Sequence, residues 1–150
     1  MYSSYTDAYD LGFDGLVDSG TFLVDSTTAK TLAVGDFVTL VAANTCGFGS
    51  ANATILGRVE AVENYSNADT DGKVATVKRR CSFEDVALSA TTTYWPSSHG
   101  DLIAVDGAGK IQKLQPLAVD TSNSQVTMVR ANCFAIEVDT TNAVATIWLD

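Results

Sequence analysis

The sequence contains one pattern twice, and this duplication constrains the fold more than any other feature. A Gly-Asp pair leading into a short apolar run occurs at residues 35–40 and again at 100–105. A valine-rich run at 74–77 is echoed at 144–147, at a similar offset, and each copy has a middle apolar run, 55–62 or 133–138. A turn followed by short apolar runs is typical of a small β unit. The sequence therefore predicts two similar β units.

The composition favours strands and turns throughout the chain. Thr, Val, Ala, Ser, Asn and Gly are abundant, and β-branched residues suit pleated strands while Gly and Asn suit turns. We predict an all-β fold, a compact β-sandwich or barrel built from two similar β units, with little helix. Residues 31–150 form a single β domain in this interpretation, with a pseudo-repeat spanning 33–84 and 98–150. The expected strands are 37–43, 54–63, 73–78, 85–89, 102–105, 110–114, 125–129, 133–138 and 143–149.

The first 30 residues differ from the rest and predict an extended N-terminal arm. Aromatic residues are interspersed among aspartates along it, with no Lys or Arg before Lys30. Rings on an extended arm need a surface to cover them, so we expect the arm to contact a partner or a sister subunit. The candidate interface residues are Tyr2, Tyr5, Asp7, Tyr9, Asp10, Phe13, Asp14 and Asp18, together with the adjacent pair Tyr94 and Trp95.

Charge, hydropathy and cysteine spacing each argue against one class of partner or site. The formal net charge is −9, which argues against nucleic acid, because affinity for a phosphate backbone comes from Lys and Arg. No apolar run approaches the ~20 residues that span a bilayer, so we expect no membrane segment. The three cysteines, Cys46, Cys81 and Cys133, are too sparse for a disulfide framework or a zinc site.

The motifs that resemble functional sites are incomplete. Residues 67–72 resemble the first half of a calcium loop, but Lys78 stands where a bidentate Glu is required. Residues 107–110 lack the spacing of a phosphate-binding loop. His99 is the only histidine, and no nucleophile-elbow pattern accompanies it. We therefore predict a protein that is not an enzyme and has no cofactor and no metal.

The only basic run is Lys78, Arg79 and Arg80. The simpler interpretation is a solvated strand end. The alternative is a docking patch for the acidic arm of a neighbouring copy, where charge guides the register of binding.

The second half of the chain resembles the capsid cement (head decoration) proteins of tailed bacteriophages. The resemblance rests on residues 99–111, a Gly-Asp strand followed by an Asp/Gly hairpin, and on residues 134–138 and 143–150, which are similar to the closing strand of that family. Residues 56–62 of the first copy are similar to the same family. The resemblance implies a homotrimer on the outer capsid surface of the virion, which joins neighbouring copies of the major capsid protein and stabilises the head.

Two other interpretations remain open at this point. A carbohydrate- or host-surface-binding β module of a tail or fibre would use Tyr94 and Trp95 as exposed rings for sugars. A hydrolase would use His99 with nearby carboxylates.

Overall fold

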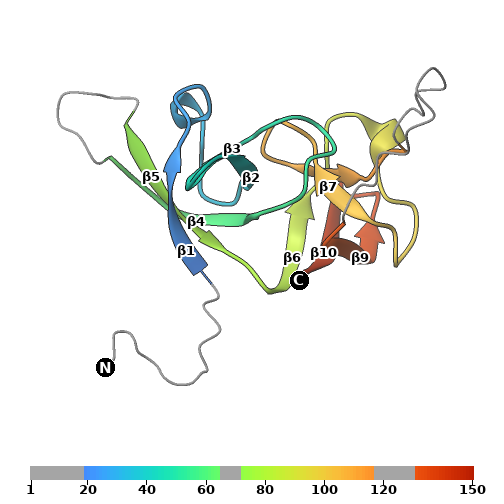
Figure 1. The fold of residues 1–150 in the computed structure, drawn as a ribbon. Helices are drawn as coiled ribbons and strands as arrows, with labels where there is room; N and C mark the ends of the chain where they lie inside the picture. Colours follow the sequence, from blue (N-terminus) through green and yellow to red (C-terminus); the bar gives the residue numbers. More distant parts are fainter. Residues whose placement is uncertain (1–18, 65–71, 117–130) are drawn as a thin grey trace, which may run out of the picture.

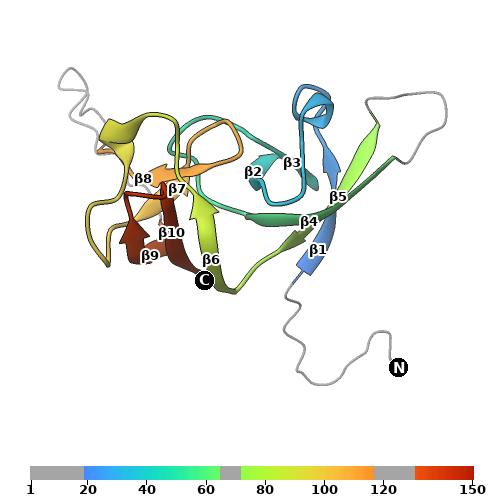
Figure 2. The same cartoon turned by 180° about the vertical axis from the view of Figure 1, so that it is seen from behind.

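The protein consists of two β units that lie side by side (Figures 1 and 2). The computed structural model describes residues 19–64, 72–116 and 131–150. The first unit contains the strands β1 (Ser19–Val24), β2 (Phe37–Ala42), β3 (Thr45–Gly47), β4 (Gly57–Asn64) and β5 (Lys73–Lys78). The second contains β6 (Cys81–Ala87), β7 (Ile103–Val105), β8 (Ile111–Lys113), β9 (Cys133–Asp139) and β10 (Val144–Leu149). Each unit has one short 3-10 helix, η1 (Thr28–Lys30) or η2 (Thr92–Tyr94).

The first unit is a closed barrel with the strand order β1-β3-β2-β4-β5. An antiparallel ladder from Ser19–Lys78 to Leu23–Val74 joins β1 to β5 and closes it. Ala75 and Val77 point inward from β5, and polar neighbours on the same strand point outward, as the period of two in a strand requires. The barrel interior is a cluster of buried apolar side chains: Val24, Ala29, Leu32, Val38, Cys46, Leu56, Val59, Ala75 and Val77.

The second unit has the same strand order but looser closure. Ladders form a three-stranded sheet, β6-β10-β9, and a two-stranded sheet, β7-β8. Single bridges join the two sheets, one antiparallel between Leu102 and Phe134 and one parallel between Leu88 and Ile111. These bridges complete the cycle β6-β8-β7-β9-β10, which matches the barrel strand for strand.

Individual hydrogen bonds also repeat between the units. In the first unit, the Gly35 N–H donates to the Val59 carbonyl and the Val59 N–H donates to the Asp36 carbonyl, both at 2.8 Å. In the second, Gly100, Ala135 and Asp101 make the same two bonds at 2.7 and 2.8 Å. Both glycines have a positive φ, which a side chain would disfavour. The Gly-Asp pattern therefore marks an equivalent turn in each unit.

The two units share one packed junction. Phe37 and Ile55 come from the first unit but are buried in the core cluster of the second. Across the same boundary, the Phe37 N–H donates to the Gly109 carbonyl at 2.8 Å, and the Asn52 N–H donates to the Val105 carbonyl at 2.9 Å. The protein is therefore one body made of two similar units.

The all-β prediction with two units is confirmed, with corrections to its boundaries. The arm expected over residues 1–30 is too long, because β1 and η1 belong to the barrel, and residues 1–18 lie outside the described residues. The repeat also begins one strand earlier in each copy, at β1 and β6, so 33–84 and 98–150 miss the first strand of each unit. β3 was not predicted, β6 begins at Cys81 instead of residue 85, and the strand expected at 125–129 lies outside the described residues.

Candidate binding groove

A groove lies at the junction of the two units. Its largest part is a cavity of about 680 Å³, lined by Thr54, Arg79, Arg80, Asn132, Trp148, Leu149 and Asp150. A hollow of about 400 Å³ adjoins it on the barrel side and shares Thr54, Arg79 and Asn132. Another of about 230 Å³ adjoins it on the other side and shares Asn132, Trp148 and Asp150. Because these hollows share lining residues, we treat them as one feature, the junction groove.

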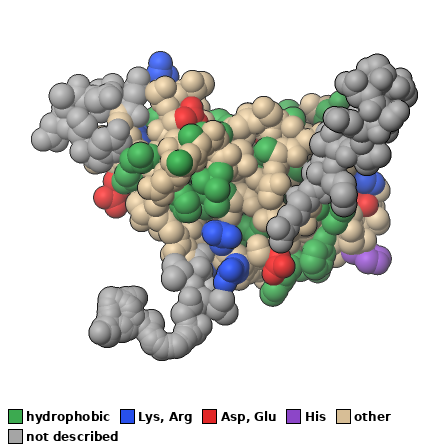
Figure 3. Space-filling model, in the orientation of Figure 1, with side chains coloured by type: hydrophobic (Ala, Val, Ile, Leu, Met, Phe, Trp, Pro, Cys, Tyr) green, Lys and Arg blue, Asp and Glu red, His purple; other side chains and the backbone are tan. Residues whose placement is uncertain are grey.

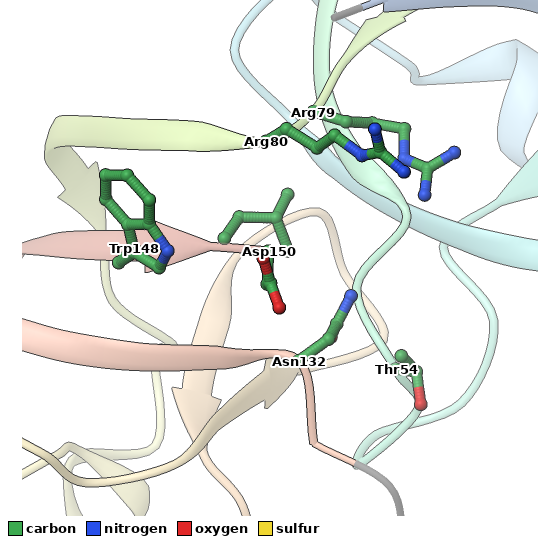
Figure 4. Close-up of a pocket in the computed structure, with 7 residues that line it drawn as sticks. Thr54, Arg79, Arg80, Asn132, Trp148 and Asp150 are labelled. Carbon is green, nitrogen blue, oxygen red and sulfur yellow. The ribbon is translucent and has the colours of Figure 1, made fainter. Parts of the chain in front are cut away.

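The two arginines form one wall of the junction groove (Figure 4). They make up the short connection between β5, which closes the barrel, and β6, which begins the second unit. Arg80 has a φ of 57°, and this left-handed turn redirects the chain between the two units. Among the described residues, the ion pairs join Arg58 to Glu60 and Lys113 to Asp101, so neither Arg79 nor Arg80 is neutralised by a described carboxylate.

The facing wall comes from the second unit. In Figure 4, Trp148 and Asp150 lie on the side opposite the arginines, and Asn132 and Thr54 lie below them. Trp148 is 42 % exposed although Ala145, Ile147 and Leu149 of the same strand are buried. The alternation along β10 thus directs Trp148 outward.

Asn132 joins the two walls. Its side-chain Nδ2 donates to the Ile55 carbonyl at 2.9 Å, and its own carbonyl accepts the Asp150 N–H at 2.9 Å. Its Oδ1 is buried and accepts no hydrogen bond from any described residue. A buried acceptor without a donor is costly, so the position of this side chain depends on the bond from its Nδ2 to the Ile55 carbonyl.

Exposed apolar side chains continue from the groove across the second unit. We define the apolar stripe as Leu102, Phe134, Ile136 and Trp148, which are between 42 % and 49 % exposed. Leu102 bridges to Phe134, and Phe134 is the register partner of Trp148. In Figure 3, basic side chains lie between two groups of hydrophobic side chains on the lower half of one face. Adjoining exposed apolar surface makes the stripe and the groove one candidate contact surface.

The carboxylates beside His99 and in the 107–110 motif, Asp101 and Asp106, are engaged in local structure. His99 is exposed in a loop, and the neighbouring Asp101 carboxylate accepts the Ser97 N–H at 2.8 Å and pairs with Lys113 at 3.2 Å. The Asp106 carboxylate accepts the N–H groups of Ala108 and Lys110, which builds the hairpin between β7 and β8. Within 19–64, 72–116 and 131–150 there is no group of three side chains suited to hold a metal, and no helix long and apolar enough to cross a membrane.

Two of the three thiols are buried in the cores. Burial raises the pKa of Cys46 to about 11 and that of Cys133 to about 12. Both therefore remain protonated at neutral pH, which is the state of structural cysteines and not of nucleophilic ones.

The site residues expected from the sequence divide into two groups. Tyr2, Tyr5, Asp7, Tyr9, Asp10, Phe13, Asp14 and Asp18 all lie outside the described residues. Tyr94 is 40 % exposed in η2, whereas Trp95 is half-buried, packs against the core of the second unit, and donates its indole N–H to the Ser89 carbonyl at 2.6 Å. The pair does not form a joint platform, because only Tyr94 is open to solvent.

Sequence reasoning missed Asn132, Phe134 and Trp148. A usable signal existed for Trp148, since a large ring between Ile147 and Leu149 must face away from them on a strand. Arg79 and Arg80 were recognised as a possible docking patch, and the structure puts both in a groove wall. No protein-family model matches the chain, and no curated protein or solved structure matches it either.

Proposed function

We propose that this protein is a capsid cement protein, which binds the outer surface of an icosahedral phage head and joins neighbouring major capsid proteins. In this proposal it acts as a homotrimer and performs no chemical reaction. The apolar stripe on the second unit is the observation that supports the proposal most directly. An exposed row of Leu, Phe, Ile and Trp side chains beside two arginines has the composition of a protein-binding surface.

The sequence resemblance and the architecture support the same function. The resemblance to cement proteins rests on residues 99–111, 134–138 and 143–150, which all lie in the second unit, the unit that contains the stripe. A rigid β body that binds several capsid subunits through a trimer gains affinity by multivalency even where each contact is weak. The carbohydrate-binding alternative, as expected from the sequence, loses one of its two rings, because Trp95 is half-buried and its indole N–H is hydrogen-bonded to the Ser89 carbonyl.

The test uses heads of the phage that encodes this chain, purified from a strain that lacks the protein. Added protein should co-sediment with these heads and raise the temperature at which they release DNA. The variant Phe134→Ala/Ile136→Ala should bind at least about tenfold more weakly, because a hot-spot side chain near the centre of an interface costs about 2 kcal/mol or more when it is truncated.

The control variant is Val34→Ala/Val41→Ala, which removes exposed apolar surface of the barrel outside the groove. It should bind heads like the unmodified protein. If the unmodified protein fails to bind heads, or if the Phe134→Ala/Ile136→Ala variant binds as well as the control, the proposal is wrong. Binding to a glycan array that is lost in Tyr94→Ala would instead support the carbohydrate-binding module.

A further inference from the structure

We propose that the junction groove is the binding site for the N-terminal segment, residues 1–18, of the same chain. This inference concerns the free protein, in which the segment occupies the groove. The groove shares Leu102, Phe134 and Trp148 with the apolar stripe, so a capsid subunit that binds the stripe would have to displace the segment. It rests on where the segment starts, on its charge, and on the two unlike walls of the groove.

The register of the barrel fixes where the segment starts. Ser19, the first residue of β1, pairs with Lys78, the last residue of β5, and the two strands are antiparallel. Arg79 and Arg80 follow Lys78 directly. Ser19, to which the segment is attached, therefore lies beside the arginine wall, and 18 residues at a maximum of roughly 3.3 Å per residue are more than enough to reach along the groove.

The charges of the segment and the groove are complementary. Residues 1–18 contain four aspartates, at positions 7, 10, 14 and 18, and neither Lys nor Arg. The groove offers Arg79 and Arg80, which lack a described ion-pair partner, and one acidic side chain, Asp150, on the facing wall. In a chain with a net charge of −9, these arginines are a rare favourable position for an acidic segment.

The order of residues in the segment also matches the two walls. Four aromatic residues recur at steps of three and four, at positions 2, 5, 9 and 13, and the four aspartates recur at similar steps. Rings and carboxylates are thus both available along the whole length of the segment. A segment between the walls can present acidic groups to Arg79 and Arg80 and rings to Trp148.

The same-chain arrangement is favoured because the segment is tethered at the groove. A short connection gives an effective concentration in the millimolar range, so even weak contacts with Arg79, Arg80 and Trp148 suffice for binding. A segment from another copy has no such advantage at micromolar protein concentrations.

The experiment reads the accessibility of Trp148 by acrylamide quenching of its fluorescence. The chain has two tryptophans, so a Trp95→Phe background leaves Trp148 as the only reporter. Deleting residues 2–18 should raise the quenching constant by about twofold or more as the ring is uncovered. The deletion spares Ser19 and the barrel ladder, and far-UV circular dichroism should confirm that the body stays folded.

Charge variants test the arginine wall in the full-length chain. Arg79→Glu/Arg80→Glu should raise the quenching constant as much as the deletion does, and 1 M salt should do so in part, since it shortens the screening length to about 3 Å. Lys73→Glu/Lys110→Glu is the matched control, because it changes the net charge equally at positions outside the groove. If the glutamate pair impairs folding, Arg79→Gln/Arg80→Gln serves in its place. Equal quenching in the full-length and truncated chains would overturn the proposal.

A mixing experiment separates the same chain from a second copy. A Trp148→Phe/Arg79→Glu/Arg80→Glu chain, also in the Trp95→Phe background, keeps its segment but has a damaged groove and no reporter. It is mixed with the truncated chain, which has an intact groove and reporter but no segment. We expect no protection of Trp148 in the mixture. Protection there would show that the segment binds another copy, and the same-chain proposal would be wrong.

Discussion

The two repeated aspartates show how one position acquires different electrostatics in each unit. Asp36 and Asp101 both follow a glycine of positive φ and both accept backbone N–H groups of the preceding turn. Burial raises the pKa of Asp36, and the nearby Asp106 raises it further. The pKa of Asp101 is lowered, because although burial opposes this, the N–H groups of Ser97 and Ser98 and the Lys113 ammonium outweigh it. The same turn position therefore favours the ionised carboxylate in the second unit and disfavours it in the first.

These opposite shifts predict opposite pH behaviour for two matched variants. Ionised Asp101 stabilises the fold above its ordinary pKa of 3.8, and this contribution is lost as the pH falls through its lower folded pKa. For Asp36, the stabilising form is the protonated one, and its contribution is lost as the pH rises through its raised folded pKa. Asp101→Asn should therefore reduce the free energy of unfolding at pH 7 by about 1–2 kcal/mol, as expected for lost charge-assisted hydrogen bonds.

Asp36→Asn should change the free energy of unfolding at pH 7 by no more than about 0.5 kcal/mol, because it removes a charge that burial disfavours. Urea unfolding at pH 3, 5 and 7 measures both variants. The deficit of Asp101→Asn should shrink at pH 3. A deficit that is independent of pH, or is larger for Asp36→Asn, would contradict this assignment.

At the scale of elements, the duplication could be predicted from the sequence where equivalent strands of the two units have similar residues. It could not be predicted where equivalent strands have the same place in the fold but different residues. The Gly-Asp turns and the strands β2, β4, β5, β7, β9 and β10 could be predicted from their matching apolar runs. β1 and β6 are equivalent, since each pairs with the last strand of its unit, but their sequences have little in common. Their equivalence follows from strand pairs whose partners lie 50 or more residues apart in the chain. Local sequence patterns do not contain this information.

The junction groove was only partly predictable for the same reason. Arg79 and Arg80 are adjacent in the chain, so their charge could be recognised from the sequence. Asn132 and Trp148 reach them only because the second unit folds back against the barrel, as the bond from Asn132 to the Ile55 carbonyl shows.

One element-scale prediction concerns Gly57, where β4 begins. A Cβ atom there would collide with the Lys78 carbonyl oxygen and the Val77 side chain of β5. Because the colliding oxygen belongs to the backbone of the barrel, Gly57→Ala should destabilise the protein by about 1–3 kcal/mol, the usual cost of overpacking.

The matched control is Gly20→Ala in β1, where a Cβ would meet only the ring of Phe22 at 3.1 Å. That ring can shift, so this variant should remain near the stability of the unmodified chain. Urea denaturation of both variants measures the difference. Equal losses at the two positions would mean that general effects of alanine, and not the contact with β5, decide the outcome.

At the scale of the whole molecule, the shared core makes the two units thermodynamically dependent on each other. Phe37, the first residue of β2 in the barrel, packs edge-to-face against Phe83 of β6, with ring centroids 5.4 Å apart. The Arg58 guanidinium lies over the ring of Phe83 in the other unit, 4.6 Å from its centroid. The Asn52 side-chain oxygen accepts a hydrogen bond from the Gln112 side-chain N–H at 3.0 Å. Opening either unit would expose these contacts, so we expect both units to unfold in one transition.

A substitution confined to the barrel tests this coupling. Val77 is fully buried in the barrel core and is not part of the second cluster, whereas both tryptophans belong to the second unit. Val77→Ala should lower the free energy of unfolding by about 2 kcal/mol through lost apolar burial and a small cavity. Tryptophan fluorescence and far-UV circular dichroism should then report the same lowered urea midpoint. Val34→Ala, at an exposed barrel position, should leave both midpoints in place. If Val77→Ala shifts the circular dichroism transition while the fluorescence midpoint stays unchanged, the units unfold separately and the shared core does not couple them.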